Sequence, residues 1–359
     1  MKAHQWDLSG VRHMKIEEES EGVETFATSP VLDHTTTERF VEELKKFRIE
    51  EVGSSRWMEQ HERLERLNQQ AHQCAASNTD EYVVEAFLTF RKIETLIHDL
   101  LTIEAWKQYV LPELINRLCE KNSMRAYFIL YHEATLINLL EILFFHKHVC
   151  ESVGDKLIEI VDYLARKLTK LNGGYDFRAV ELSGRSSKGP QELTEDILTR
   201  SPLEELGSHL TDIEFKVCIS SVSILRFLCE HADALPLSVI SRITDTHDFL
   251  VLVIPLIENP PWTRRLDGKW QKLIDQKWTD VAPIDLLKVT KLEGQPWLTL
   301  YFLLAKQIIR ERYHINGFRK SQILRVRKYL NEVLLDQLPF LADIQVRIYS
   351  LFHLDSIYF

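Results

Sequence analysis

Apolar side chains recur along this chain at the three- and four-residue spacing of amphipathic helices. From Thr36 onwards this spacing predicts a series of helices joined by short connections. The segment from Ser55 to Ala75 has few apolar positions and is predicted to be a rather exposed helix, whereas Met124 to Phe144 is apolar on nearly every face and is predicted to be buried on several sides. Such a series predicts an all-α fold, an armadillo- or HEAT-like helical solenoid stacked right-handedly without β-sheet. No repeat of fixed period occurs, so a globular helical bundle stays open.

Changes in composition along the chain divide it into parts. Residues 1–33 show no period and are predicted to be a flexible N-terminal tail. Residues 34–174 form the expected N-terminal helical half, and residues 193–359 form the C-terminal half. Between them, residues 175–192 are rich in glycine and serine and are predicted to be a flexible linker. Residues 262–295 are rich in Trp, Lys and Asp and are expected to be an ordered insertion or long loop.

The overall composition excludes several classes of protein. With 45% hydrophobic residues, 27% charged residues and only 12 glycines in 359 residues, the chain is expected to fold and to be helical. A net charge of −9 without a basic stripe argues against nucleic-acid binding. Five scattered cysteines are typical of buried thiols in a reducing compartment. The N-terminus has no apolar signal core, and the apolar runs at 134–145 and 249–257 are interrupted or short. We therefore expect a cytoplasmic protein without direct membrane insertion.

The motifs of common enzymes are incomplete in this sequence. The glycines at 184 and 189 have phosphate-loop spacing, but Pro190 stands where the lysine is needed, which favours a plain linker. His132-Glu133 begins a zinc-protease motif, but Leu136 replaces the second histidine. No catalytic residue and no cofactor are therefore assigned.

Three further residues could support chemistry. His146 and Cys150 are four residues apart, on one helix face, and could provide two metal ligands; a structural role at a helix end is favoured because zinc needs more ligands. Glu141 lies in the most apolar helix, where a buried carboxylate is either catalytic or a satisfied core group. The corresponding alternative function is a metal- or carboxylate-dependent helical enzyme that uses His132, Glu133, Glu141 and His146.

A group of aromatic and basic residues marks the insertion. Trp262, Arg264 and Arg265 are of the residue types that dominate protein interfaces, and they form the candidate partner-binding site. The same types also anchor long loops onto a core, and this second role is favoured.

Several segments of the sequence resemble the zinc finger MYND domain-containing protein 10 family of dynein axonemal assembly factors. They keep their order along most of the chain and comprise Arg56–Ala71, Trp106–Gln108, His132–Glu141, Phe144–Ser152, Pro261–Arg265, Val281–Pro283, Lys291–Trp297 and Leu334–Pro339.

The resemblance implies a non-enzymatic cytoplasmic scaffold or co-chaperone for preassembly of outer and inner dynein arms in motile cilia. It implies axonemal dynein heavy chains as clients, and heat-shock chaperones, an immunophilin co-chaperone and a leucine-rich-repeat assembly factor as partners. The expected location is the cytoplasm of ciliated cells, including the apical cytoplasm and centriolar satellites.

The zinc site of the family is not expected in this chain. Family members carry a C-terminal MYND finger, a zinc-binding Cys/His cluster, but this sequence has no C-x-x-C pair, so the MYND finger and its zinc are expected to be absent. A third function stays open beside the scaffold and the enzyme, namely a cytoskeletal trafficking adaptor that binds tubulin or mature motors.

Overall fold

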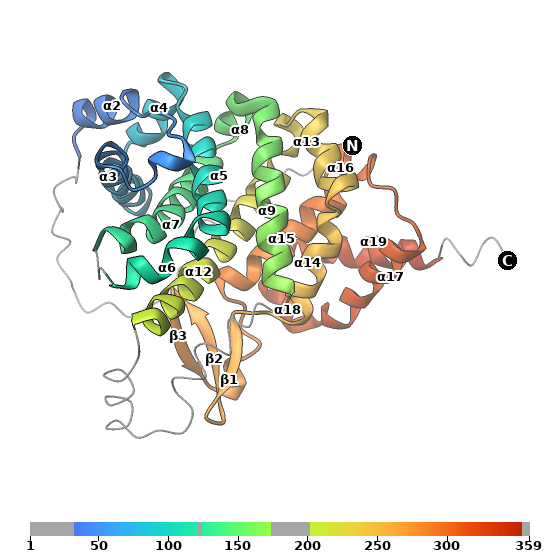
Figure 1. Cartoon of the computed structure of the whole chain (residues 1–359). Helices are drawn as coiled ribbons and strands as arrows, with labels where there is room; N and C mark the ends of the chain where they lie inside the picture. The colour runs from blue at the N-terminus through green and yellow to red at the C-terminus, as the bar shows by residue number, and fades with distance from the viewer. Residues whose placement is uncertain (1–31, 121–123, 174–201, 354–359) are drawn as a thin grey trace.

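The fold is built mostly from helices (Figure 1). The computed structural model describes residues 32–120, 124–173 and 202–353. The helices up to residue 173 are α2 (His34–Glu42), α3 (Ser55–Ser77), α4 (Tyr82–Thr89), α5 (Ile93–Tyr109), α6 (Leu111–Glu120), α7 (Met124–Phe144), α8 (Lys147–Val153) and α9 (Leu157–Asn172).

A second series of helices follows from residue 202. Its members are α12 (Pro202–Glu230), α13 (Leu237–Ser241), α14 (Phe249–Glu258), α15 (Lys291–Ala305), α16 (Gln307–Arg310), α17 (Gly317–Val326), α18 (Glu332–Gln337) and α19 (Leu341–His353). The three strands β1 (Thr263–Leu266), β2 (Lys269–Ile274) and β3 (Lys277–Val281) lie between α14 and α15.

Helices that are near one another in sequence also pack together, so the chain advances through the molecule in order (Figure 1). Helices α2 and α3 contact α4, and α3 and α5 contact α7. Helix α12 then packs on α7, α9 and α15, and α14 packs on α9, α15 and α17. The predicted all-helical class is confirmed in its main feature. Contacts between sequence neighbours are also what a helical stack requires.

Helices α7 and α12 form the centre of the core. Leu139 and Leu140 of α7 are both fully buried, as its apolar pattern predicts, and one continuous cluster of buried side chains crosses from the first helical series into the second. The segment Ala126–Phe144 is long and apolar enough to cross a bilayer, but 61% of that stretch is buried inside the protein. A core helix of this kind passes the same test of length and composition.

The predicted linker and most of the predicted N-terminal tail lie outside the described residues. The predicted linker, residues 175–192, lies outside them, as do residues 1–31 of the predicted tail. Leu32 and Asp33 are ordered, however: the Leu32 side chain is 2% exposed, its backbone N–H donates to Gln70 Oε1 at 2.9 Å, and Asp33 caps α2 through Thr36 N.

The expectation of a stack without β-sheet is wrong for residues 263–281. Strands β1, β2 and β3 form an antiparallel sheet in that order. Each connection is a two-residue turn with positive φ at both positions, Asp267-Gly268 (49° and 78°) and Asp275-Gln276 (46° and 66°). An Asp-Gly pair in such a turn matches the right-handed twist of the flanking strands, and it is a strong hairpin feature of the sequence. The Trp- and Lys-rich insertion is therefore a small meander that projects from the helical stack (Figure 1).

Candidate partner-binding site

The three predicted site residues do not share one surface. Trp262 is 1% exposed and Arg264 is 6% exposed, whereas Arg265 is exposed. Adjacent residues on a strand point to opposite faces, which explains the contrast between Arg264 and Arg265. Arg264 donates from Nε to Gln271 Oε1 at 2.8 Å, and its guanidinium lies 3.9 Å from the ring centre of Trp278. Arg264 therefore ties the three strands to one another and Trp262 is buried at the start of the sheet, and their role in binding a partner stays a prediction.

A buried lysine joins the sheet to α15. Lys272 of β2 donates from Nζ to the carbonyl oxygens of Leu286 and Lys288, at 2.8 and 2.7 Å, and forms an ion pair with Glu293 at 3.0 Å. Glu293 also accepts from the backbone N–H of Thr290, which in turn caps α15. These bonds satisfy the buried ammonium group and fix the course of residues 286–290.

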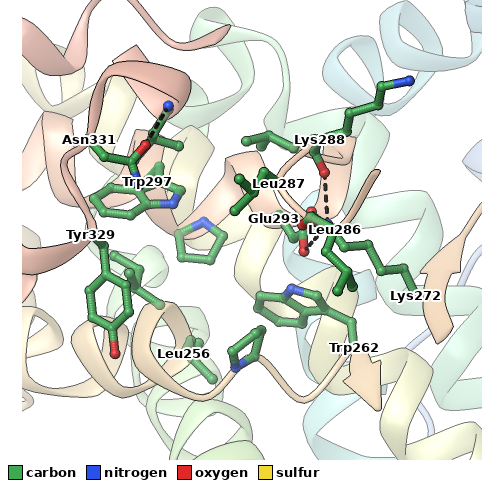
Figure 2. A pocket seen from close by; sticks show the side chains of 15 residues that line it. Leu256, Trp262, Lys272, Leu286, Leu287, Lys288, Glu293, Trp297, Tyr329 and Asn331 are labelled. Atoms are coloured by element: carbon green, nitrogen blue, oxygen red, sulfur yellow. Dashed lines mark hydrogen bonds and ion pairs between the residues drawn. The ribbon is translucent and has the colours of Figure 1, made fainter. Parts of the chain in front are cut away.

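The residues fixed in this way border a pocket of about 200 Å³. Figure 2 shows Trp262 on one side of it, Trp297 and Tyr329 on the other, Leu256 below and between them, and Leu286 to Lys288 near Glu293. Segments far apart in the sequence thus meet there, namely α14, the sheet, the 286–289 segment, α15 and residues 329–334. Its lining residues are Leu256, Ile257, Pro260, Trp262, Lys272, Leu286, Leu287, Lys288, Val289, Glu293, Pro296, Trp297, Tyr329, Asn331 and Leu334.

Exposed apolar side chains lie on the segment that borders this pocket and on the turn before it. Leu287 lines it and is 61% exposed, and Ile284, in the preceding turn Pro283–Asp285, is 85% exposed. Gln337 of α18 donates from Nε2 to the carbonyl oxygens of Leu287 and Val333, both at 2.9 Å. This bonding places Val333, itself 45% exposed, beside the same segment.

The residues of the alternative enzyme site do not converge. His132 points toward α3 and α5: its Nδ1 lies 2.8 Å from Nδ1 of His61, and its Nε2 lies 3.2 Å from Oδ2 of Asp99. Because a carboxylate only accepts, His132 Nε2 is assigned as the donor to Asp99, and His61 Nδ1 then donates to His132. Trp57 covers the pair, with its ring 4.4 Å from that of His132.

Glu133, next to His132, turns into a separate ionic network. It is fully buried and forms ion pairs with Lys107 of α5 at 2.6 Å and Lys167 of α9 at 2.7 Å, while the hydroxyl of Tyr163 donates to it at 2.8 Å. Glu214 of α12 pairs with Lys167 at 2.9 Å. Burial by itself raises the pKa of Glu133, but the charges of Lys167 and Lys107 overcome that effect and hold its pKa well below its usual range.

The other two candidate residues are also in separate places. Burial raises the pKa of Glu141, although hydrogen bonds with Ser220 and Ser223 oppose the shift. His146 lies 3.1 Å from Glu81, and Cys150 is fully buried, with a pKa that burial raises to about 12. A thiol held in its protonated form is a poor metal ligand, because the thiolate binds metal.

Acidification is expected to destabilise the protein through His61. Burial, then the charge of His132, lowers the pKa of His61 from 6.5 to about 3, while Asp99 opposes the shift; Glu65 lies 3.7 Å from its Nε2. Since the unfolded chain binds this proton at higher pH than the folded chain, the stabilisation is present above pH 6.5 and is lost as pH falls toward 3. Urea denaturation at about pH 7 and about pH 5 measures how far the free energy of unfolding falls between the two pH values. This decrease should be larger for the natural chain than for His61→Gln. Equal losses would contradict a neutral buried His61.

Comparison with known proteins places the chain in a family. It is 32% identical over 310 residues to the zinc finger MYND domain-containing protein 10 homolog of Drosophila melanogaster, which is 86% of this chain. The chain belongs to the zinc finger MYND domain-containing protein 10 family. It spans 66% of the length of that relative. No family model and no solved structure matches it.

The family name refers to a zinc finger, and the residues described for this member do not fit one. Among residues 32–120, 124–173 and 202–353, no group of three or more His, Cys, Asp and Glu side chains is placed to hold a metal ion. Cys74, Cys150, Cys218 and Cys229 are each buried and free of disulfides, and burial raises the pKa of Cys218 and Cys229. No step of a mechanism is therefore assigned to zinc in the described residues.

Proposed function

We propose that this member of the zinc finger MYND domain-containing protein 10 family is a non-enzymatic helical scaffold for the assembly of axonemal dynein arms. The observation that carries the proposal is the match across 86% of the chain. The geometry supports a scaffold, because the buried charged groups around Glu133 and His132 form their contacts between helices and connect those helices to one another. The metal- or carboxylate-dependent enzyme is less favoured because its four residues lie in separate environments.

The proposed clients are axonemal dynein heavy chains, and the proposed partners are heat-shock chaperones, an immunophilin co-chaperone and a leucine-rich-repeat assembly factor. The proposed location is the cytoplasm of ciliated cells. Very large multidomain chains expose apolar surface while they fold. A scaffold that binds client and chaperone together raises their effective concentration without any catalytic residue.

The test is to supply this chain to multiciliated cells that lack the endogenous family member. Restored dynein heavy-chain levels and arms on otherwise normal axonemes are the expected result. Normal dynein arms in the deficient cells before any rescue would refute the assembly role. Recovery of the chain with tubulin or mature motors, without nascent heavy chains, would instead support the trafficking adaptor. Stable expression of the chain without restored arms would show that these residues do not suffice as the scaffold.

A further inference from the structure

The pocket beside the sheet has walls made of flat rings. Trp262, Trp297 and Tyr329 provide aromatic surfaces, and Pro260 and Pro296 provide pyrrolidine surfaces (Figure 2). Grooves lined by aromatic rings bind proline-containing segments in the polyproline II conformation, because the ligand is stiff and loses little entropy on binding. The lining therefore favours an extended, proline-containing ligand over a globular surface.

An unpaired donor lies in the same walls. The indole Nε1 of Trp262 is buried and has no hydrogen-bond acceptor among the described residues. In Figure 2 this nitrogen is on the side of the ring that faces the other pocket residues. Buried indole N–H groups normally have a partner. An extended polyproline II segment makes no internal hydrogen bonds, so its carbonyl groups are free to accept from such a donor.

The charge of the residues around the pocket indicates the charge of a ligand that would bind there. Residues 286–289, Tyr329 and Asn331 line it, and the segments 286–291 and 325–332 to which they belong contain five basic residues and one acidic residue, within a chain of net charge −9. Asp285 pairs with Lys288, and Glu258 pairs with both Arg325 and Lys328, so five basic residues stand beside three acidic ones when Glu332 is included. A local excess of cations on an acidic protein favours an acidic partner through electrostatic complementarity.

The exposed apolar edge adds contact area outside the pocket. Ile284, Leu287 and Val333 are exposed. Gln337 donates to the backbone carbonyls of both Leu287 and Val333 and so holds these two residues close together. Exposed apolar side chains grouped at the edge of a pocket mark interaction sites.

We propose that this pocket binds an extended, acidic, proline-containing segment of a partner protein. Proline rings of the segment lie between Trp262 and Trp297, one of its carbonyls accepts from Trp262 Nε1, and its acidic residues lie near Lys288 and Lys328. The biological role of the partner rests on the proposed scaffold function, but the binding itself does not.

The test uses the purified chain and a fluorescein-labelled synthetic peptide with a proline-rich centre flanked by glutamates. Fluorescence polarisation is expected to show saturable binding that weakens with added salt. Replacing the peptide prolines by alanine, or the glutamates by lysine, is expected to weaken binding about tenfold or more. Tighter binding of either control peptide, or no saturable binding of the first peptide, would overturn the proposal.

Variants of the chain locate the binding surface. Trp262→Phe keeps an aromatic ring, although a smaller one, and removes the N–H donor; it should weaken binding at least about three- to tenfold, as expected for loss of one hydrogen bond. The double variant Lys288→Glu and Lys328→Glu should weaken it about tenfold. Lys147→Glu reverses an exposed charge on α8 and is the matched control. Unchanged affinity in both pocket variants, with circular dichroism like that of the natural chain, would also overturn the proposal. Because rescue of dynein arms is measured separately, absence of peptide binding would leave the scaffold function standing.

Discussion

Glu133→Ala is expected to reduce the free energy of unfolding by about 3–5 kcal/mol, the cost of removing one member of a buried ion pair. Glu133 is fully buried, and its carboxylate contacts ammonium groups of Lys107 and Lys167 and the hydroxyl of Tyr163. Removing it leaves Lys167, which is buried, and Lys107, which is 10% exposed, with Glu214 as their shared partner and with Glu104 at 3.7 Å from Lys167. The measurement is urea denaturation near pH 7.

A matched control is available at the surface. Glu43 pairs with Arg63 at 2.7 Å, but both side chains are well exposed to solvent. Glu43→Ala should therefore cost less than about 1 kcal/mol. Glu133→Ala combined with Lys167→Met removes one charge of each sign and should recover part of the loss, which a double-mutant cycle with the two single variants measures. A loss below about 1 kcal/mol for Glu133→Ala would show that the network does not hold the helices together.

The network also accounts for part of the acid sensitivity of the fold. The pKa of Glu133 is lower in the folded chain than its ordinary value of 4.5. The stabilisation from this group is therefore present above pH 4.5 and is lost as the pH falls further. His61 acts at higher pH, since its ordinary value is 6.5. The contributions of the two groups can be separated by pH. Between about pH 6.5 and 4.5, His61→Gln changes the decrease in the free energy of unfolding, whereas a Glu133 variant does not.

The helical class followed from the sequence because it depends on local pattern. The apolar spacing of α7 and the scarcity of glycine were sufficient to predict a helical stack with α7 at its centre. The sheet at residues 263–281 had one local signal in the sequence, the Asp267-Gly268 turn, whereas the strands on either side of that turn do not alternate apolar and polar residues. The interpretation of this segment as an insertion or loop gave its Trp and Lys content more weight than its turn chemistry.

Helix α3 shows where local pattern is insufficient. Its apolar positions are few, so it was expected to be rather exposed, but it also buries Gln60, His61 and Gln70. Gln60 exchanges two hydrogen bonds with the backbone of Lys45, both at 2.9 Å, and Gln70 accepts from Leu32 N. These partners are distant in the sequence, so no local pattern indicates that the polar side chains are satisfied and buried.

The pocket could be predicted only in part for the same reason. Trp262 was selected from its residue type, and the structure places it in the lining. Trp297, Tyr329 and Leu287 come from other elements and meet Trp262 only in the folded chain. The exposed fraction of each side chain, which separates Arg265 from Arg264, depends on tertiary packing and is not contained in the residue type.

Trp57→Ala is expected to reduce the free energy of unfolding by about 3–5 kcal/mol, the usual cost of deleting a large buried aromatic side chain. Trp57 is 1% exposed at the start of α3, where its ring stacks on His61 and lies against His132 of α7. The substitution removes that cover and leaves a cavity next to His61, whose pKa burial lowers, and next to its partner His132. Trp270→Ala is the matched control: Trp270 is 37% exposed on β2, so its loss should cost less than about 1 kcal/mol. Urea denaturation with an unchanged m-value measures both variants. Equal losses for the two tryptophans would contradict the packing of α3 against α7, whereas a large loss for Trp57 alone would show that this contact stabilises the first part of the stack.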